Sequence, residues 1–195
     1  MRMLKDWHEW FTFTGVVFTA VAALPLAALA VWVLARRRSG TAATRAWAWR
    51  RSLAEVGIVY GTLPWVWMTL LPGDRAGVNL VPLRDLLTIL DDRGPVELAG
   101  QVVGNLLVFA ALGFFAPLRF AALAKLSRIL ALAAGCSILV ETAQYVLHLG
   151  RVSSVDDVLL NTAGAGLAAL VSRRWWRATA KASSDRPRSA TAPGS

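Results

Sequence analysis

The sequence predicts an all-α fold, a polytopic transmembrane helical bundle of about five membrane-spanning helices. Of the 195 residues, 56% are hydrophobic, and the mean hydropathy is +0.50. A soluble domain averages about 45–50% apolar residues. The apolar residues form long blocks, and clusters of charge lie between these blocks and at the chain ends. This arrangement in blocks, more than the high share of apolar residues itself, is typical of a chain that crosses a membrane several times.

Five apolar blocks are candidates for crossing a bilayer, which takes about 20 residues of α-helix. They run from about residues 10–34, 53–71, 98–118, 129–149 and 158–172. The first block is longer than the apolar core of a signal peptide, which is about 7–15 residues, so we expect an uncleaved helix. The fifth block is short for a full crossing. We expect it either to be tilted little or to begin at the Asp156–Asp157 turn.

The segments between the blocks alternate along the chain between basic ones and ones of mixed charge. The segments around residues 35–52, 119–128 and 173–188 are rich in Arg and Lys, whereas residues 72–97 and 148–157 contain most of the acids. Because basic loops stay in the cytoplasm, this alternation predicts an outside N-terminus and a cytoplasmic C-terminus. We divide the chain into an N-terminal transmembrane helix with an Arg-rich cytoplasmic loop (1–51), a membrane domain (52–172) and a basic, disordered cytoplasmic tail (173–195).

The net charge of +9 would suggest nucleic-acid binding in a soluble protein. Here the basic residues flank apolar blocks, so membrane lipids are the expected partners and nucleic acid is not. The single cysteine, Cys136, excludes an intramolecular disulfide and a cysteine metal cluster. No fingerprint for a nucleotide, haem or zinc is present, so neither a cofactor nor a metal site is expected. The oligomeric state is left open.

Three of the predicted helices carry polar side chains three or four residues apart, so each set shares one helical face. The sets are Gln101 and Asn105, then Glu141, Gln144 and His148, and lastly Asp157 and Asn161. At about 1.5 Å per residue, each set lies within roughly 10 Å of the outer end of its helix. Asn79, Arg84 and Asp85 come from the long outer loop, and Arg151 and Asp156 come from the turn before the fifth helix. The sequence therefore predicts a polar pocket open to the outside, in which Glu141 pairs with Arg151 or with an amide.

Polar residues inside a membrane also have a purely structural interpretation. Asn and Gln often join membrane helices through hydrogen bonds, and for Asn105 and Asn161 this alternative is as good as a binding role. A carboxylate inside the membrane costs about 2.5–3.5 kcal/mol, so a functional role is favoured for Glu141. His148, at the interface, is expected to be an anchor or a hydrogen-bonding residue rather than a catalyst.

Several of these residues fall in motifs that resemble the VanZ-like family over about residues 79–170. The motifs are Asn79-Leu80-Val81-Pro82-Leu83, Gly104-Asn105-Leu106-Leu107-Val108-Phe109 with Leu112-Gly113, Glu141-Thr142-Ala143-Gln144, and Gly150-Arg151 with Asp156-Asp157-Val158-Leu159-Leu160-Asn161-Thr162-Ala163-Gly164. Two positions depart from the family pattern. Ala111 stands where the family usually has proline, which leaves a kink in the third helix unsupported. Ser154 stands where an acid is frequent, which removes one charge from the outer site.

The resemblance implies an envelope protein, because the family's name-giving member is associated with low-level resistance to teicoplanin. We prefer a non-enzymatic protein whose pocket binds a lipid-linked cell-wall precursor, a lipid headgroup or the glycopeptide itself. The binding residues would be Asn79, Asn105, Gln144, Arg151 and Asn161. The alternative is a membrane enzyme acting on a lipid-linked or peptidoglycan substrate. In it, Glu141 would be the general base, with Asp156 or Asp157 as a second carboxylate or cation ligand.

Overall fold

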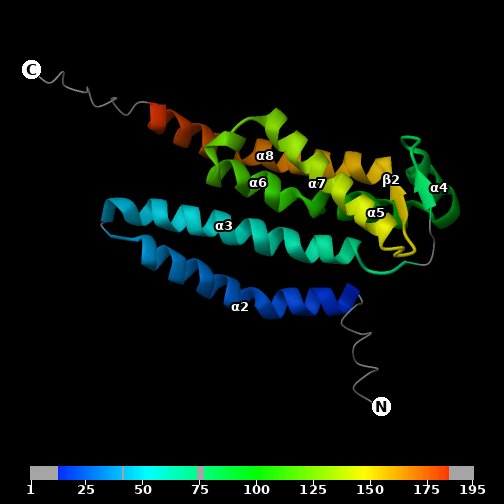
Figure 1. Ribbon diagram of the computed structural model, residues 1–195, viewed down its shortest axis with the longest axis horizontal. Helices are drawn as coiled ribbons and strands as arrows, with labels where there is room; N and C mark the ends of the chain where they lie inside the picture. Colours follow the sequence, from blue (N-terminus) through cyan, green and yellow to red (C-terminus); the bar gives the residue numbers. More distant parts are fainter. Residues whose placement is uncertain (1–12, 41, 74–76, 185–195) are drawn as a thin grey trace, which may run out of the picture.

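The computed structural model describes residues 13–40, 42–73 and 77–184, and these form a bundle of long helices capped at one end by two short strands (Figure 1). The long helices are α2 (Phe13–Arg38), α3 (Ala42–Thr69), α5 (Pro95–Val108), α6 (Ala110–Arg119), α7 (Leu126–Val146) and α8 (Val155–Ser184). The shorter elements are β1 (Gly77–Asn79), α4 (Arg84–Arg93), the 3-10 turn η1 (Ala121–Leu123) and β2 (Val152–Ser154).

The helices pack as neighbours in a row, with α2 at one edge against α3 and α3 against α6. Helix α8 contacts α5, α6 and α7, so it lies at the centre of the bundle. Figure 1 shows the two ends of the bundle to differ. The α2–α3 connection and the C-terminal end of α8 lie at what we call the basic end. Strands β1 and β2 and helix α4 lie at the opposite end, which we call the strand end.

Among the residues that the structure describes, four helical segments are long and apolar enough to cross a membrane, and the all-α membrane bundle is thereby confirmed. They are Thr14–Arg38, Pro95–Arg119, Leu126–Val146 and Val155–Trp176. Helix α3, which contains all but the last two residues of the predicted block 53–71, has 28 residues but is not among the four. Its Gly, Thr, Trp and Pro64 residues dilute its apolar character. It nevertheless runs beside α2 and returns the chain from the basic end to the strand end (Figure 1).

Helix α8 begins at Val155, so the aspartate pair lies in its first turn, as one of the two alternatives for the fifth block expected. Acidic residues there interact favourably with the N-terminal end of the helix dipole. At the other end, α8 continues to Ser184, so residues 173–184 of the segment expected to be disordered are helical. The rest of that tail lies outside the described residues.

The third predicted span is interrupted at Phe109, which separates α5 from α6. No proline causes this break, because position 111 is alanine. The break lies between two points at which the span touches α8. A Cβ added at Gly164 would overlap the carbonyl oxygen of Leu106, and one added at Gly113 would overlap the backbone of α8. Glycine is thus required for these two close backbone contacts, a common way of joining membrane helices.

The buried apolar core is built mainly from small side chains. Its members are Val108, Phe109, Ala116, Ile129, Ala133, Ala165 and Ala169, all from α5, α6, α7, α8 and the break between α5 and α6. Many large apolar side chains are instead on the outside, including Phe18, Leu26, Leu139 and Val171. A soluble protein rarely exposes so much contiguous apolar surface. Close helix packing inside and large apolar residues outside together fit a lipid environment.

The strand end is held together by backbone contacts between distant segments. Strands β1 and β2 pair in parallel, with Gly77 opposite Val152 and Asn79 opposite Ser154. Next to them, the Gly73 N–H donates to the Leu149 carbonyl oxygen at 2.8 Å. These contacts fasten the segment after α3 to the turn before α8. Neither the strands nor α4 was expected from the sequence.

Candidate functional site

The strand end contains a cavity of ≈ 490 Å³. Its wall consists of Gly73, Asp85, Thr88, Ile89, Asp92, Arg93, Gln101, Gly150, Arg151, Val152 and Asp157. Three carboxylates and two guanidinium groups therefore face one space. Of the residues predicted to form the site, this wall contains Asp85, Gln101, Arg151 and Asp157. The other predicted residues lie around it and take part in other contacts.

Asp157 is a buried residue of this cavity wall and lies in the first turn of α8. Its Oδ1 accepts hydrogen bonds from Gln101 Nε2 at 2.9 Å and from Asn105 Nδ2. Both donors come from α5, so the predicted polar faces of these two helices meet here. Within the described chain, no group donates to Oδ2 of Asp157. One oxygen of this carboxylate is therefore held by the protein, and the other is available to a ligand.

Arg151 enters the same cavity from the turn before β2. Its one hydrogen bond to a described residue is a long one, 3.5 Å from a terminal nitrogen to the carbonyl oxygen of Leu71. It forms no salt bridge with any carboxylate that the structure describes. The predicted ion pair between Glu141 and Arg151 is thus not present. The guanidinium keeps most of its hydrogen-bonding capacity, which suits an oxyanion.

Glu141 is buried, but it faces a different region of the strand end. Its Oε2 accepts the backbone N–H of Ser154 at 3.0 Å, and its own carbonyl oxygen accepts the Ser153 hydroxyl at 3.0 Å. Both bonds fasten β2 to α7. The amide that pairs with Glu141 is therefore a backbone amide. Glu141 lines a separate, shallow depression with Val78, Thr142, Tyr145 and Ser153.

Asp156 is only 1% exposed, and its carboxylate is fully engaged with α4. Oδ1 accepts the N–H of Leu83 at 2.5 Å, while Oδ2 accepts those of Asp85 at 3.1 Å and Leu86 at 3.4 Å. The first N–H groups of a helix have no partner within the helix, and a carboxylate there is stabilising. Leu83, the N-cap residue of α4, supplies no side-chain cap of its own. Asp156 thus positions the cavity wall without facing the cavity.

Gln144 and Asn161 form hydrogen bonds between helices. Gln144 Nε2 donates to the Thr69 carbonyl oxygen at 2.7 Å, which joins α7 to the end of α3. Asn161 Nδ2 donates to the Ser137 hydroxyl at 2.8 Å, which joins α8 to α7. Neither side chain lines the cavity. This geometry is that of interhelical hydrogen bonding, the structural alternative weighed for Asn161 above.

Asn79 and His148 lie where a strand and a helix end. Asn79 ends β1, and its Oδ1 accepts the N–H of Val81 at 3.2 Å, a local turn that asparagine favours. His148 follows the end of α7, is exposed and has a φ of 52°, and it is not part of the cavity wall.

Helix α4 supplies the cavity residues that sequence reasoning missed, among them Thr88, Asp92 and Arg93. The Gly94-Pro95 pair that separates α4 from α5 is the signal that could have revealed it, because proline favours the first position of a new helix. Burial and the neighbouring Asp156 carboxylate raise the pKa of Asp85, against a smaller opposing effect of a hydrogen bond with Asn79. Within the described chain, no group of three His, Cys, Asp or Glu side chains could hold a metal ion.

The family model described as VanZ/LLP1 matches residues 58–177, which is more than half of the chain. The match includes every residue that the sequence predicted for the site, and all of the cavity wall. Neither the comparison with curated proteins nor that with solved structures returns a match.

Proposed function

Because the chain belongs to the VanZ/LLP1 family and has the helices of a membrane protein, we propose that it binds the headgroup of a lipid-linked cell-wall precursor in the strand-end cavity. Such a headgroup combines phosphate with sugar hydroxyl groups. Teicoplanin acts at the outer face of the membrane, where these precursors are used. A protein that holds the precursor there contributes to teicoplanin resistance.

The observation that carries this proposal is that Arg151 and Asp157 line the same cavity without forming a salt bridge with each other. A buried or half-buried charge without a partner is unfavourable, so such groups are normally compensated. Arg151 has no ion-pair partner in the described chain, and Asp157 Oδ2 has no donor. Arginine binds phosphate through two parallel N–H bonds, and carboxylates accept from sugar hydroxyl groups. A ligand with a phosphate and sugar hydroxyl groups would give Arg151 an anion to bind and Asp157 Oδ2 a hydrogen-bond donor.

The distribution of basic residues supports an outer position for this cavity. The arginines at the C-terminal end of α2, at the end of α6 and after residue 172 of α8 all belong to the basic end. Basic segments remain in the cytoplasm, so the strand end would face outward, with the N-terminus outside and the C-terminus inside. A ligand would then enter from the outer leaflet.

The second candidate is a membrane enzyme with Glu141 as general base. It has less support, because Glu141 Oε2 is occupied by the Ser154 N–H and Glu141 does not line the 490 Å³ cavity. A base must reach the proton that it removes. Asp157 is better placed for such a role, because it lines the cavity and its Oδ2 accepts no hydrogen bond from a described residue.

The test uses a strain that lacks the protein and is complemented at equal membrane abundance. We expect the wild type to raise the inhibitory concentration of teicoplanin, and Arg151→Gln and Asp157→Asn to abolish the increase. Asp91→Asn is the matched control, because Asp91 is exposed on α4 and does not line the cavity. If Glu141→Gln alone removes the effect, the enzyme is favoured. If the wild type has no effect, the resistance role is wrong.

A direct measurement separates binding from resistance. Native mass spectrometry of the purified protein with an undecaprenyl-linked disaccharide pentapeptide should show a bound species for the wild type and for Asp91→Asn. Arg151→Gln should lose this species, because one charged hydrogen bond accounts for about 1.5–3 kcal/mol. Equal binding by all variants would refute the assignment of the cavity.

A further inference from the structure

The basic end contains a second cavity, of ≈ 530 Å³, which the proposed function does not use. It lies between the N-terminal half of α3, the C-terminal half of α6 and the two tryptophans of α8. Its wall consists of Ala46, Trp47, Arg50, Arg51, Leu53, Phe114, Phe115, Pro117, Leu118, Arg119, Ala121, Ala124, Trp175 and Trp176. The wall is thus mainly apolar, with a group of arginines on one side.

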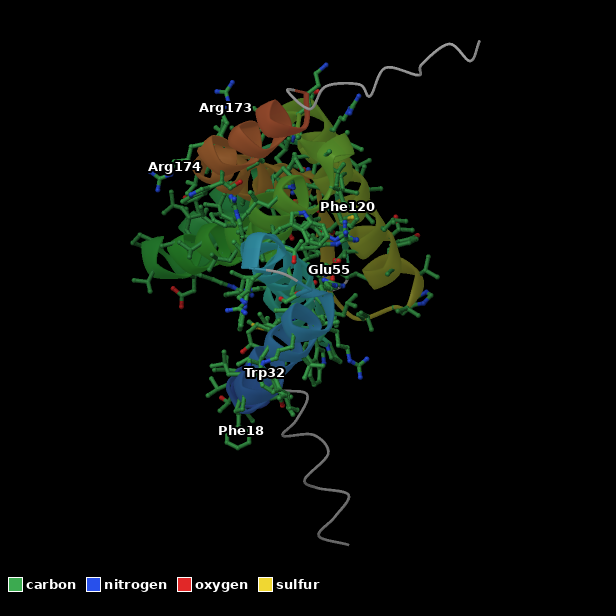
Figure 2. The ribbon with its side chains drawn as sticks, turned by 90° about the vertical axis from the view of Figure 1, so that its left-hand side faces the viewer. Phe18, Trp32, Glu55, Phe120, Arg173 and Arg174 are labelled. Atoms are coloured by element: carbon green, nitrogen blue, oxygen red, sulfur yellow. The ribbon has the colours of Figure 1, made fainter. Side chains whose placement is uncertain are left out.

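Two of these arginines are held in place by one carboxylate. Glu55 accepts from Arg51 Nε at 3.4 Å and from Arg119 Nε, and it forms a salt bridge with Arg38 at 2.7 Å. Figure 2 views the molecule from this end, with Glu55 in the interior of the bundle and Arg173 and Arg174 pointing away from it. Glu55 thereby draws together cations from α2, α3 and α6.

The way in which Glu55 binds them leaves an anion site. Arg51 and Arg119 each use Nε for Glu55, and the described residues provide no acceptor for their terminal nitrogens. Each guanidinium also lies over an aromatic ring, Arg51 at 5.1 Å from Trp47 and Arg119 at 4.6 Å from Phe120. The flat faces are therefore covered, whereas the N–H edges remain open. Such edges match the oxygens of a phosphate.

The charge of this end favours an anionic ligand. Three guanidinium groups, those of Arg38, Arg51 and Arg119, contact the single carboxylate of Glu55. A fourth, that of Arg50, lines the same cavity and has no acceptor among the described residues. Three positive charges are left uncompensated. Anionic lipids are enriched in the cytoplasmic leaflet, and each basic residue near it attracts them.

The apolar wall fits the rest of a lipid molecule. Phe114 packs against Phe115 with ring centroids 4.9 Å apart and against Trp175 at 5.7 Å, and Leu118 lies beside them in the cavity wall. This surface belongs to the membrane-spanning segments Pro95–Arg119 and Val155–Trp176. It therefore lies where an acyl chain would continue from a phosphate held at the arginines.

We propose that this cavity is a binding site for one anionic phospholipid of the leaflet at the basic end. The phosphate contacts Arg50, Arg51 and Arg119, and an acyl chain lies along Phe114 and Trp175. Bound there, the lipid connects α3, α6 and α8, of which Glu55 joins only α3 and α6 through its salt bridges.

The experiment is native mass spectrometry of the purified full-length protein with phosphatidylglycerol and phosphatidylethanolamine of the same acyl chains. We expect the anionic lipid to be retained and the zwitterionic lipid to be lost. Arg50→Gln should lower retention of phosphatidylglycerol about fivefold, the effect of one cationic contact with an anionic headgroup. This variant breaks no hydrogen bond that the structure describes, so the fold is retained.

Arg173→Gln is the matched control, because it removes one charge from the same end outside the cavity. It should leave retention unchanged. An equal loss in both variants would mean diffuse attraction rather than a site, and equal retention of both lipids would refute the phosphate contacts. Glycerol phosphate has the headgroup chemistry without a chain. If it displaces phosphatidylglycerol at equal concentration, the site is one for soluble anions and the lipid assignment is wrong.

Discussion

Replacement of Asp156 by alanine should detach α4 from the rest of the strand end. Helix α4 has no buried residue of its own, so packing contributes little to its position. Its N-terminus is instead held by the three N–H groups that donate to Asp156. The 3.4 Å bond is weak, which leaves two good bonds to a charged acceptor.

How much stabilisation α4 loses in Asp156→Ala depends on what replaces these hydrogen bonds. Hydrogen bonds to charged groups contribute about 1.5–3 kcal/mol each when the alternative is an unsatisfied group. Water reaches the freed N–H groups here, because the first residues of α4 are exposed or half-buried. The loss is therefore closer to that of a helix cap, about 1–2 kcal/mol. This raises the population of detached α4 by about 5–30-fold.

Hydrogen–deuterium exchange measures this population directly. In Asp156→Ala, amides of residues 84–93 should exchange about 5–30-fold faster, whereas those of α7 should not change. Asp91→Ala, an exposed change on the same helix, should leave the rates as they are. Unchanged exchange in α4 of Asp156→Ala would refute the role of Asp156 as its cap. Uniformly faster exchange would mean that the substitution unfolds the bundle.

Two further predictions concern the same protein without a ligand. Gly164→Ala should lower the free energy of unfolding of the purified protein, measured by thermal denaturation, by about 1–3 kcal/mol, because backbone must move to admit the methyl group. In the control Gly135→Ala the methyl group meets open space, so the free energy should not change. For Asp85, the folded state binds its proton more tightly than the unfolded chain, so stability should fall as pH rises above the ordinary value of 3.8. Asp85→Asn should make this slope shallower in pH-dependent melting curves, and an unchanged slope would contradict the assigned cause, burial beside Asp156.

Features set by local periodicity could be predicted from the sequence. Hydropathy located the long helices, and the spacing of Gln101, Asn105 and Asp157 indicated polar faces at a common depth. The structure brings these three side chains together. Helical periodicity is a property of neighbouring residues, so one sequence is sufficient to recognise it.

Features that depend on distant backbone could not be predicted. The partners of Asp156 and Glu141 are N–H groups, and every residue except proline offers one, so sequence carries no signal of the pairing. Three-residue strands are also too short to show alternation. The sequence therefore identified Glu141 as polar and buried, but it could not show that this carboxylate fastens β2 rather than faces the cavity.

The distance along the chain between Leu83 and Asp156 sets the order in which the protein can be built. These residues are 73 positions apart, and β2, the partner of β1, is also made late. At about 5–20 residues per second, a ribosome needs roughly 4–15 s to make the intervening segment. During that time the α4 segment has been synthesised without its cap. The cavity is therefore completed only when the last helix enters the membrane, and a chain truncated before α8 would insert its earlier helices without it.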